Sequence, residues 1–313
     1  MEFSHIPVMY KQVIDGLKIK ENGIYVDGTL GGGGHASGVC ERLGSEGLFI
    51  GIDKDNDALS AASKRLLESS TPCVKHFVQA NYSDIKASLC QLGITGIDGA
   101  MLDLGVSSFQ LDNPERGFSY MHDAPLDMRM NVQDSFTAED VVNGYSEKEL
   151  CRVIKDYGEE RWAARIAKFI VNARKEQEIT TTYQLVDIIK AAIPAAARRD
   201  GPHPAKRTFQ AIRIEVNDEL GHLKKAVDDF IDVLNPGGRL AIITFHSLED
   251  RIVKEAFQKR LNPCTCPPEF PVCVCGKVSD AVKVSGKPFF PTDGEIEENP
   301  RARSAKLRII EKK

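Results

Sequence analysis

The sequence predicts an α/β protein with a parallel, doubly wound sheet and a long helical insert. The first observation is a β-branched run, Ile24–Val26, followed by the consecutive glycines Gly31–Gly34. Such glycines allow a turn in which the backbone approaches a ligand closely. The second observation is that three further apolar runs alternate with helical patterns, which is typical of a doubly wound sheet. The third is that the next strand pattern, Gly238–Phe245, lies far along the chain.

The first part of the chain predicts four strands and the helices that join them. Residue spacing predicts helices over 7–17, 36–43, 58–67 and 83–92, and strands over 24–26, 48–52, 74–78 and 99–104. Asp53, Tyr82 and Asp103 then fall at or just beyond strand ends. Because doubly wound sheets bind ligands at the carboxyl ends of their strands, these residues are candidates for a binding site.

The insert follows the fourth strand. In sequence, Arg239 comes 136 residues after Asp103, whereas a simple crossover needs only a few tens of residues. Helical patterns occupy 137–142, 147–156, 160–175 and 182–197, and a further helix over 218–234 and a turn over 235–238 precede the fifth strand. We therefore expect a sheet domain formed by residues 1–110 and 215–313, with a β-rich end, and an inserted substrate-recognition domain over residues 111–214.

Composition is that of an ordinary globular protein. The chain has 313 residues, of which 42% are hydrophobic and 27% charged. No run approaches the ~18 apolar residues of a membrane helix, and the first residues lack a signal-peptide pattern. We expect a cytoplasmic protein without a membrane partner, with its eight cysteines as thiols or metal ligands rather than disulfides. Composition does not predict an oligomeric state.

Positive charge is concentrated in the middle of the chain. Residues 1–150 carry 12 basic and 22 acidic side chains, residues 151–215 carry 13 and 8, and residues 216–313 carry 16 and 15. Four of the basic residues flank a Gly-Pro-His-Pro loop: Arg198, Arg199, Lys206 and Arg207. This excess suits a phosphate-bearing partner, and a merely solvated helical surface is the alternative.

The glycine turn predicts a nucleotide-type pocket. Asp53 follows the glycines by about 20 residues, a spacing at which an acidic side chain accepts hydrogen bonds from ribose hydroxyls. Gly31, Gly33 and Ala36 also satisfy the looser dinucleotide pattern G-x-G-x-x-A, so spacing alone does not identify the ligand. A glycine-rich surface turn with a coincidental acid is the remaining alternative.

The stretch Met101–Asp112 is the second candidate site. A strand ends in the carboxylate of Asp103, and a polar cluster of Ser107, Ser108 and Gln110 follows. Such a turn can hold both a ligand and the group with which it reacts. The alternative is that Asp103 only caps the following turn.

The tail contains two C-x-C pairs, Cys264 with Cys266 and Cys273 with Cys275. Four thiolates can bind zinc, but zinc sites usually have wider spacing within each pair. We therefore expect reduced thiols in a loop and predict no metal site.

Several motifs together closely resemble the ribosomal RNA small-subunit methyltransferase H family. They cover nearly the whole chain in the family's order: Asp27–His35, Asp103–Ser108 with Gln110, Lys206–Arg213, Thr244–Asp250 and Arg301–Lys306. The resemblance implies a class I S-adenosylmethionine-dependent methyltransferase fold with a helical insert. It also implies methylation of the exocyclic N4 of one cytidine in the decoding (P-site) region of 16S rRNA, in the small ribosomal subunit.

The family pattern also implies which residues hold the methyl donor. By position they are Gly33, Gly34, His35, Asp53, Tyr82, Asp103 and Gln110. Asp53 would bind the ribose, Tyr82 would lie beside the adenine, and Asp103 and Gln110 would lie near the methionine end. Several relatives have Phe in place of Tyr82, and stacking on the adenine survives that change.

Asp103 is the candidate catalytic residue. The N4 lone pair of cytosine is delocalised into the ring, so a hydrogen-bond acceptor must turn the amine until this lone pair faces the methyl group. Ser107 and Ser108 are candidates to assist. His246 is a candidate base or phosphate contact, with a structural histidine as the equal alternative. Candidate stacking platforms for the unstacked target base are Phe118, Tyr120 and Phe209.

Three other functions are compatible with parts of the sequence. A nicotinamide-dependent oxidoreductase fits the glycine pattern, but the insert leaves no room for a second mononucleotide half in the usual place. A C5-cytosine methyltransferase would use Cys264 as its nucleophile, but this residue follows the fifth strand, away from Asp103. The third is an RNA-binding protein that retains the fold without catalysis.

Overall fold

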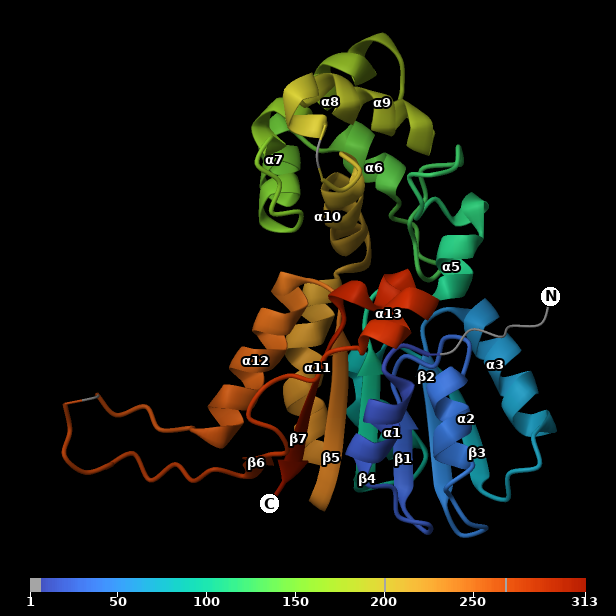
Figure 1. Ribbon diagram of the computed structural model, residues 1–313, viewed down its shortest axis with the longest axis vertical. Coiled ribbons are helices and arrows are strands. Elements are labelled where there is room, and N and C mark those ends of the chain that lie inside the picture. The colour runs from blue at the N-terminus through green and yellow to red at the C-terminus, as the bar shows by residue number, and fades with distance from the viewer. Residues whose placement is uncertain (1–6, 200, 268) are drawn as a thin grey trace. The chain divides into compact units, whose positions relative to one another are not determined.

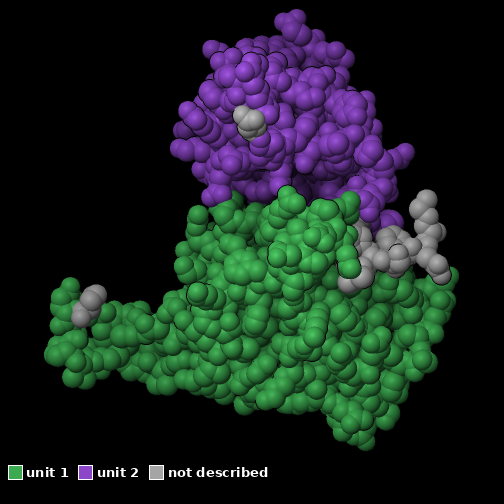
Figure 2. Space-filling model, viewed as in Figure 1, with its two compact units in different colours: residues 1–105, 220–313 green, residues 106–219 purple. Residues whose placement is uncertain are grey.

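The computed structural model describes residues 7–199, 201–267 and 269–313, and of Ser108 it describes the backbone alone. The chain divides into two compact units, which Figure 2 distinguishes by colour. Unit 1 comprises residues 1–105 and 220–313, and unit 2 comprises residues 106–219. Each unit is described by itself below.

Unit 1 contains a seven-stranded sheet with the order β3-β2-β1-β4-β5-β7-β6 (Figure 1). Its strands are β1 (Ile24–Asp27), β2 (Leu48–Asp53), β3 (Val74–Gln79), β4 (Ile97–Asp103), β5 (Leu234–Thr244), β6 (Ala281–Lys283) and β7 (Lys306–Lys312). Strands β1 to β5 pair in parallel, and β7 runs antiparallel to β5 and β6. The strand order reverses between β1 and β4, which is where sheets of this kind bind ligands.

Helices cover both faces of this sheet, which confirms the predicted doubly wound class. Successive side chains alternate between the faces, as Phe49 and Ile50 of β2 do. One face packs against α1 (Tyr10–Leu17), α2 (Gly34–Cys40) and α3 (Asn56–Glu68). The other packs against α4 (Ile85–Gln91), α11 (Glu219–Val233) and α12 (Ser247–Leu261). Short helical segments complete the unit: η1 (Tyr82–Asp84), α13 (Asp293–Glu298) and η4 (Pro300–Ser304).

Residues 235–238, predicted as a turn before the fifth strand, instead form an irregularity within β5. The pairing with β4 passes from Ile97 opposite Leu234 to Gly99 opposite Arg239. Residues 235–238 therefore bulge out opposite Asp98, and Gly237 adopts a φ of 78° there. Residues 235–238 leave the regular pairing, as their turn-forming residue types predict, but pairing with β4 on both sides of them makes them part of β5.

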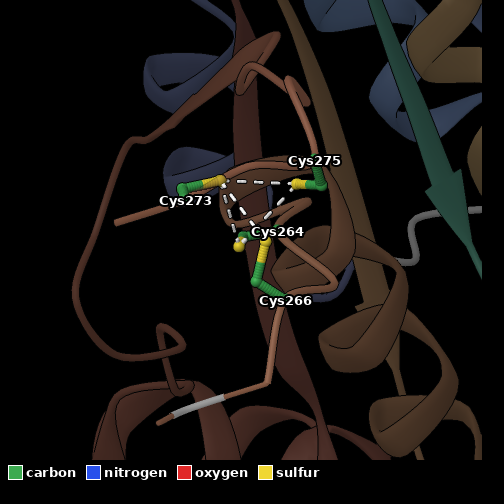
Figure 3. Close-up of side chains that lie close together, drawn as sticks. All are labelled: Cys264, Cys266, Cys273 and Cys275. Carbon is green, nitrogen blue, oxygen red and sulfur yellow. Dashed lines mark hydrogen bonds between the residues drawn. The ribbon is translucent and has the colours of Figure 1, made fainter. Parts of the chain in front are cut away.

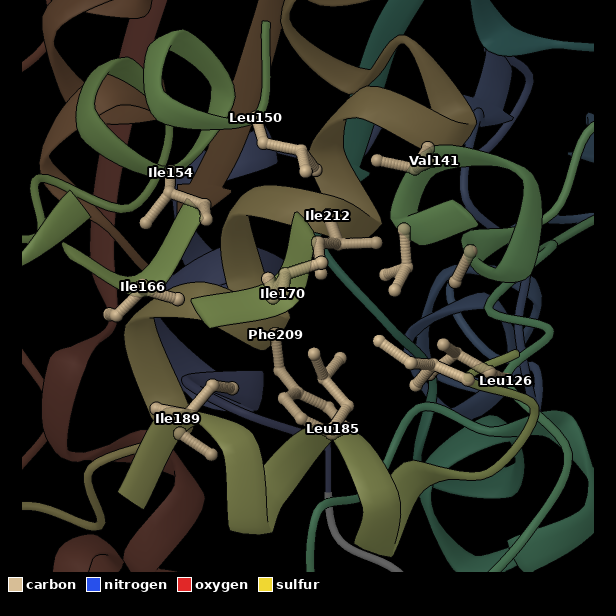
Figure 4. Packing of buried hydrophobic residues seen from close by; sticks show 14 of the residues in the cluster. Leu126, Val141, Leu150, Ile154, Ile166, Ile170, Leu185, Ile189, Phe209 and Ile212 are labelled. Carbon is tan, nitrogen blue, oxygen red and sulfur yellow. The ribbon is translucent and has the colours of Figure 1, made fainter. Parts of the chain in front are cut away.

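Unit 2 is mostly helical, as predicted for the insert. Its helices are α5 (Ser108–Asp112), η2 (Pro114–Arg116), α6 (Ala138–Gly144), α7 (Glu147–Asp156), α8 (Ala163–Glu176), α9 (Thr182–Ala192), η3 (Ala195–Arg198) and α10 (Lys206–Asn217). Capping boxes at Thr137, Ser146 and Thr181 fix the starts of α6, α7 and α9. The apolar faces of these helices form one core, in which Phe209 and Ile212 of α10 pack centrally (Figure 4).

Among the longer helices, α9, α10 and α12 differ most from the prediction. Helix α9 ends at Ala192 rather than at residue 197, because Pro194 disfavours helical geometry in the residue before it. Helix α10 was not predicted, since its basic residues obscured the apolar spacing. Helix α12 was not predicted either, and its buried side chains are only Glu249, Val253 and Phe257. No helix in the described ranges is long and apolar enough to cross a membrane.

Candidate active site

The glycine turn joins β1 to α2 and lies at the carboxyl end of β1. Gly31 and Gly33 have φ values of 48° and 71°, a left-handed conformation that other side chains disfavour. Gly28 is needed for a different reason, because a Cβ there would lie 2.5 Å from Cδ2 of Leu102 and 3.2 Å from Cβ of Tyr82. The absence of a side chain at Gly28 therefore allows β1, β4 and Tyr82 to lie close together.

Backbone hydrogen bonds fix this turn to the two neighbouring strands. The Gly28 N–H donates to the Met101 carbonyl of β4, and the Leu30 N–H donates to the Ile52 carbonyl of β2, both at 3.0 Å. The hydroxyl of Thr29 accepts a hydrogen bond of 2.6 Å from the Asp103 N–H. The end of β4 is thus positioned directly by the glycine turn.

Asp53 lies at the end of β2, as predicted, and its carboxylate is fixed by the backbone. Oδ2 accepts from the Gly31 N–H at 2.8 Å, and Oδ1 accepts from the Asp55 N–H at 2.9 Å. Burial is the main cause that raises the pKa of Asp53, and these N–H groups oppose it. The half-buried carboxylate retains further lone pairs, so it is able to accept hydrogen bonds from hydroxyl groups.

Asp27 at the end of β1 is an acid of this site to which the sequence pattern gave no role. Its side chain is only 2% exposed. Burial, with a smaller contribution from the negative charge of Asp53, raises its pKa to about 7. A hydrogen bond from the Thr29 N–H acts in the opposite direction and lowers the pKa. The signal available in the sequence was its position immediately before the glycine turn.

Asp103 is the least satisfied polar group of the site. Its side chain is 28% exposed, yet Oδ1 is buried and has no hydrogen-bond partner among the described residues. Burial, followed by the negative charges of Asp27 and Glu249, raises the pKa of Asp103 to about 8. A bound ligand that offers a positive charge or an N–H group would satisfy this oxygen.

His35 lies beside Asp103 at the start of α2. Its Nε2 is 3.0 Å from the Val8 carbonyl, which can only accept, so this nitrogen carries the proton. Burial lowers the pKa of His35 to about 4. The ring is therefore neutral at pH 7, and its unprotonated Nδ1 lies 3.9 Å from Oδ2 of Asp103.

The remaining candidates have identifiable structural contacts. In unit 2, Ser107 and Gln110 form a capping box at α5: the Gln110 N–H donates to the Ser107 hydroxyl, and Oε1 of Gln110 accepts from the Ser107 N–H. In unit 1, His246 caps α12 through Nδ1, and its Nε2 is 3.1 Å from Oε1 of Glu249. The side chain of Ser108 lies outside the described part of the structure.

The candidate stacking residues of unit 2 are largely part of its core. Phe118 and Phe209 are 7% and 3% exposed. Tyr120 is half-buried, stacks on His203 with ring centroids 4.6 Å apart and meets the Phe209 ring edge-on. The aromatic side chains that the sequence suggested for base stacking therefore already have packing partners.

Six of the predicted donor-site residues lie on or against the glycine turn in unit 1: Gly33, Gly34, His35, Asp53, Tyr82 and Asp103. Gln110, the seventh, belongs to unit 2. The structure brings the six together because the ends of β1, β2 and β4 are adjacent in the sheet.

The sheet order and the antiparallel β7, together with the glycine turn after β1, define a class I S-adenosylmethionine-dependent methyltransferase fold. S-adenosylmethionine is the cofactor of this class. The chain belongs to the MraW methylase family, whose family model matches residues 2–313. The resemblance found in the sequence is therefore confirmed, and the nicotinamide-dependent alternative is excluded.

Individual relatives cover the whole chain. It is 57% identical over 312 residues to the ribosomal RNA small subunit methyltransferase H of Ruminiclostridium cellulolyticum, with 100% of both chains covered. The protein of the same name from Clostridioides difficile is 55% identical over 312 residues, again covering 100% of both. Among solved structures, an rRNA methylase from Streptococcus thermophilus covers 99% of both chains with a TM-score of 0.45 and 12% identity.

The unsatisfied carboxylate generates a prediction for stability. Because the pKa of Asp103 is higher in the folded protein than in the unfolded chain, ionising this carboxylate destabilises the folded state. The destabilising effect begins as the pH rises above about 4 and is complete above about 8. We expect Asp103→Asn to raise the thermal unfolding midpoint of the ligand-free protein, and by more at pH 8 than at pH 5.5. Scanning calorimetry at both pH values measures this, with Asp156→Asn at an exposed position as the control. An equal shift at both pH values would contradict the raised pKa.

Proposed function

We propose that the protein transfers a methyl group from S-adenosylmethionine to the exocyclic N4 of a cytidine in the decoding (P-site) region of 16S rRNA, in the small ribosomal subunit. The observation that carries the proposal is the buried oxygen of Asp103, which has no partner among the described residues and lies at the end of β4 beside the glycine turn. The family membership supplies the reaction class. The names of the curated relatives support the RNA substrate.

The residues around the turn fit the methyl donor. We assign Gly33 and Gly34 to the close backbone approach, Asp53 to the ribose hydroxyls and Tyr82 to the adenine. His35 and Gln110 complete the proposed donor-binding set. When bound, S-adenosylmethionine supplies an electrophilic methyl group on a sulfonium centre and a cationic amino group. A carboxylate with an unsatisfied oxygen, such as that of Asp103, suits a cation at this place.

Asp103 is also assigned the catalytic role. Its carboxylate accepts a hydrogen bond from the N4 amine and holds the amine so that the nitrogen lone pair points at the methyl group. This interaction strengthens as the nitrogen becomes positively charged, so it stabilises the transition state more than the bound substrate. Because ionisation of Asp103 in the free protein is opposed by burial, a nearby positive charge promotes the ionised form.

His35 gives the site a second, neutral acceptor. The Val8 carbonyl holds its proton on Nε2, so Nδ1 keeps a free lone pair on the side of Asp103. A neutral ring adds no positive charge that would repel the sulfonium group. We assign His35 the role of a neutral hydrogen-bond acceptor for an N–H group of the bound donor or of the target amine, rather than that of a general acid.

The insert is assigned to RNA recognition. Arg198 and Arg199 are exposed at the end of η3, and Lys206 and Arg207 are exposed at the start of α10, where they are able to contact phosphates. The target cytidine must be unstacked to reach a protein side chain, which is easiest in a looped or single-stranded RNA. A cytoplasmic location is consistent with such a substrate.

The deciding experiment identifies the product. Small ribosomal subunits that lack the modification are incubated with the protein and S-adenosylmethionine, and the 16S rRNA is digested and analysed by nucleoside mass spectrometry. We expect N4-methylated cytidine at one position. Methylation at C5 would support the rival cytosine chemistry, and donor binding without any methylated nucleoside would support a non-catalytic RNA-binding protein.

Asp53→Ala tests the ribose contact. Loss of charge-assisted hydrogen bonds costs about 1.5–3 kcal/mol, so we expect the dissociation constant for S-adenosylmethionine to rise by at least about tenfold in calorimetric titration. Asp53→Asn keeps an acceptor oxygen and should have an intermediate effect. Asp15→Ala, on the exposed side of α1, is the matched control. An unchanged dissociation constant for Asp53→Ala would remove Asp53 from the donor site.

Asp103→Ala and Asp103→Asn separate catalysis from binding. Removing one preorganised group of this kind typically lowers the rate by about 10²–10³, so we expect such a decrease in single-turnover experiments at saturating donor and RNA. Asn should fall between wild type and Ala. A rate for Asp103→Ala within a few-fold of wild type would reduce Asp103 to a donor contact and assign the orienting role to Ser107, Ser108 or a backbone carbonyl.

The basic residues generate a prediction for salt dependence. The Arg198 and Arg207 side chains each donate to a backbone carbonyl, of Ile193 and Glu159 respectively, so Arg199→Gln with Lys206→Gln is the less disruptive pair of changes. Removing one cation that binds a phosphate should flatten the log–log salt slope of RNA binding by about 0.7–0.9, while donor affinity stays the same. The matched control replaces two exposed lysines of the same unit, Lys148 and Lys175, by Gln. Equal slopes for both double variants would mean that the segment is only a solvated surface.

A further inference from the structure

Four thiols meet in the segment that joins α12 to β6 (Figure 3). They belong to Cys264, Cys266, Cys273 and Cys275, here called the thiol cluster, and all four sulfur atoms lie within 4.8 Å of one another. The Sγ of Cys273 is 3.4 Å from those of Cys264 and Cys275 and 3.8 Å from that of Cys266. The Sγ atoms of Cys264 and Cys275 are 3.8 Å apart.

Four of these sulfur–sulfur distances, at 3.4–3.8 Å, are close to the edges of a metal-binding tetrahedron. A zinc–sulfur bond of about 2.3 Å gives sulfur–sulfur edges of about 3.8 Å in a tetrahedral site. A disulfide would require about 2.05 Å, and all four cysteines are free thiols. The sequence pattern predicted no metal because spacing within each pair is narrow. In the structure the narrow spacing within each pair does not prevent a four-sulfur cluster, because the two pairs lie close together and each contributes two sulfur atoms.

The described residues of the segment that carries the cluster form no core of their own. None of its described residues between Asn262 and Asp280 is buried, and none belongs to a helix or strand. Its large apolar side chains are exposed instead: Phe270, Val272, Val274 and Val278. The segment extends away from the sheet in Figure 1. A loop of this length without a core needs a cross-link to adopt one conformation.

A backbone N–H group donates to one of the sulfur atoms. The Val274 N–H lies 3.3 Å from Sγ of Cys266. Such a donor stabilises the thiolate, which is the form that binds metals. Gly276 has a φ of 66°, a left-handed conformation that glycine adopts without strain and that allows the turn after Cys275.

We propose that Cys264, Cys266, Cys273 and Cys275 bind one zinc ion as a tetrahedral tetrathiolate site that holds residues 262–280 in a single conformation. Four protein ligands close the coordination sphere, so the site is structural rather than catalytic. A tetrahedral set of four sulfurs suits zinc or iron. Zinc is assigned because the site needs no redox activity to act as a cross-link. The proposal does not depend on the proposed methyl transfer.

Metal analysis of the purified full-length protein tests this directly. The protein is prepared in reducing, chelator-free buffer with zinc supplied, and unbound metal is removed by gel filtration. We expect about one zinc per chain by mass spectrometry of the metal content, released when a mercurial reagent titrates the thiols. Cobalt substitution should give the intense visible absorption of a tetrahedral thiolate site.

Two double variants separate the cluster from the other thiols. Cys264→Ser with Cys273→Ser should reduce bound zinc at least about tenfold, since one ligand is removed from each pair. Cys90→Ser with Cys151→Ser changes two thiols outside the cluster and should leave the amount of bound zinc unchanged. Limited proteolysis should cleave residues 262–280 of the first variant faster, while its thermal unfolding midpoint and S-adenosylmethionine binding stay close to wild type, because the segment contributes no core.

Three outcomes would overturn the proposal. The first is zinc well below one per chain after incubation with excess zinc, with all thiols freely titratable. The second is a disulfide within the cluster, found by mass spectrometry of the unreduced protein. The third is equal zinc content in the two double variants. Iron in place of zinc would overturn the assignment of the metal.

Discussion

The candidate active-site end of unit 1 depends on the close approach of β1 and β4 at Gly28. A side chain there would overlap Leu102, and the two strands would have to separate. The hydrogen bonds from Gly28 to Met101 and from Asp103 to Thr29 would then lose their geometry. One missing side chain thus determines where the carboxylate at the end of β4 lies, and the glycine turn and Asp103 form a single structural unit.

This packing places three carboxylates at neighbouring strand ends, where Asp27 is buried and Asp53 and Asp103 are partly buried. Asp27, Asp53 and Asp103 each have a raised pKa, with burial as the main cause in every case. Their hydrogen bonding differs. Asp53 accepts hydrogen bonds from two backbone N–H groups, whereas one carboxylate oxygen of Asp103 has no hydrogen-bond partner among the described residues. A folded protein gains nothing from an unsatisfied buried carboxylate. Such a group is retained at sites where a ligand supplies the missing interaction, often at a cost in stability.

The sequence was sufficient for the sheet and for most of the candidate site, because both follow from short-range patterns. Apolar runs identify the strands, and parallel strands bring their ends together, so Asp53 and Asp103 were placed correctly at strand ends. The capping contacts of His246 and Gln110, by contrast, depend on exact helix starts. The approach of the two C-x-C pairs depends on the path of a loop without periodicity. Spacing within one pair says nothing about the distance to the other.

The connectivity of the chain places the whole of unit 2 between the carboxyl end of β4 and the start of α11. Unit 2 begins at Val106, three residues after Asp103, and the chain returns to unit 1 at Leu220. Between these points the insert has its own buried core and its own capped helices, so its sequence is able to change without altering the sheet. The only part of β4 that the insertion constrains is its carboxyl end, where Gly105 leaves the strand with a φ of 95°. Substitutions in the core of the insert therefore affect residues that are separate from those that set the position of Asp103.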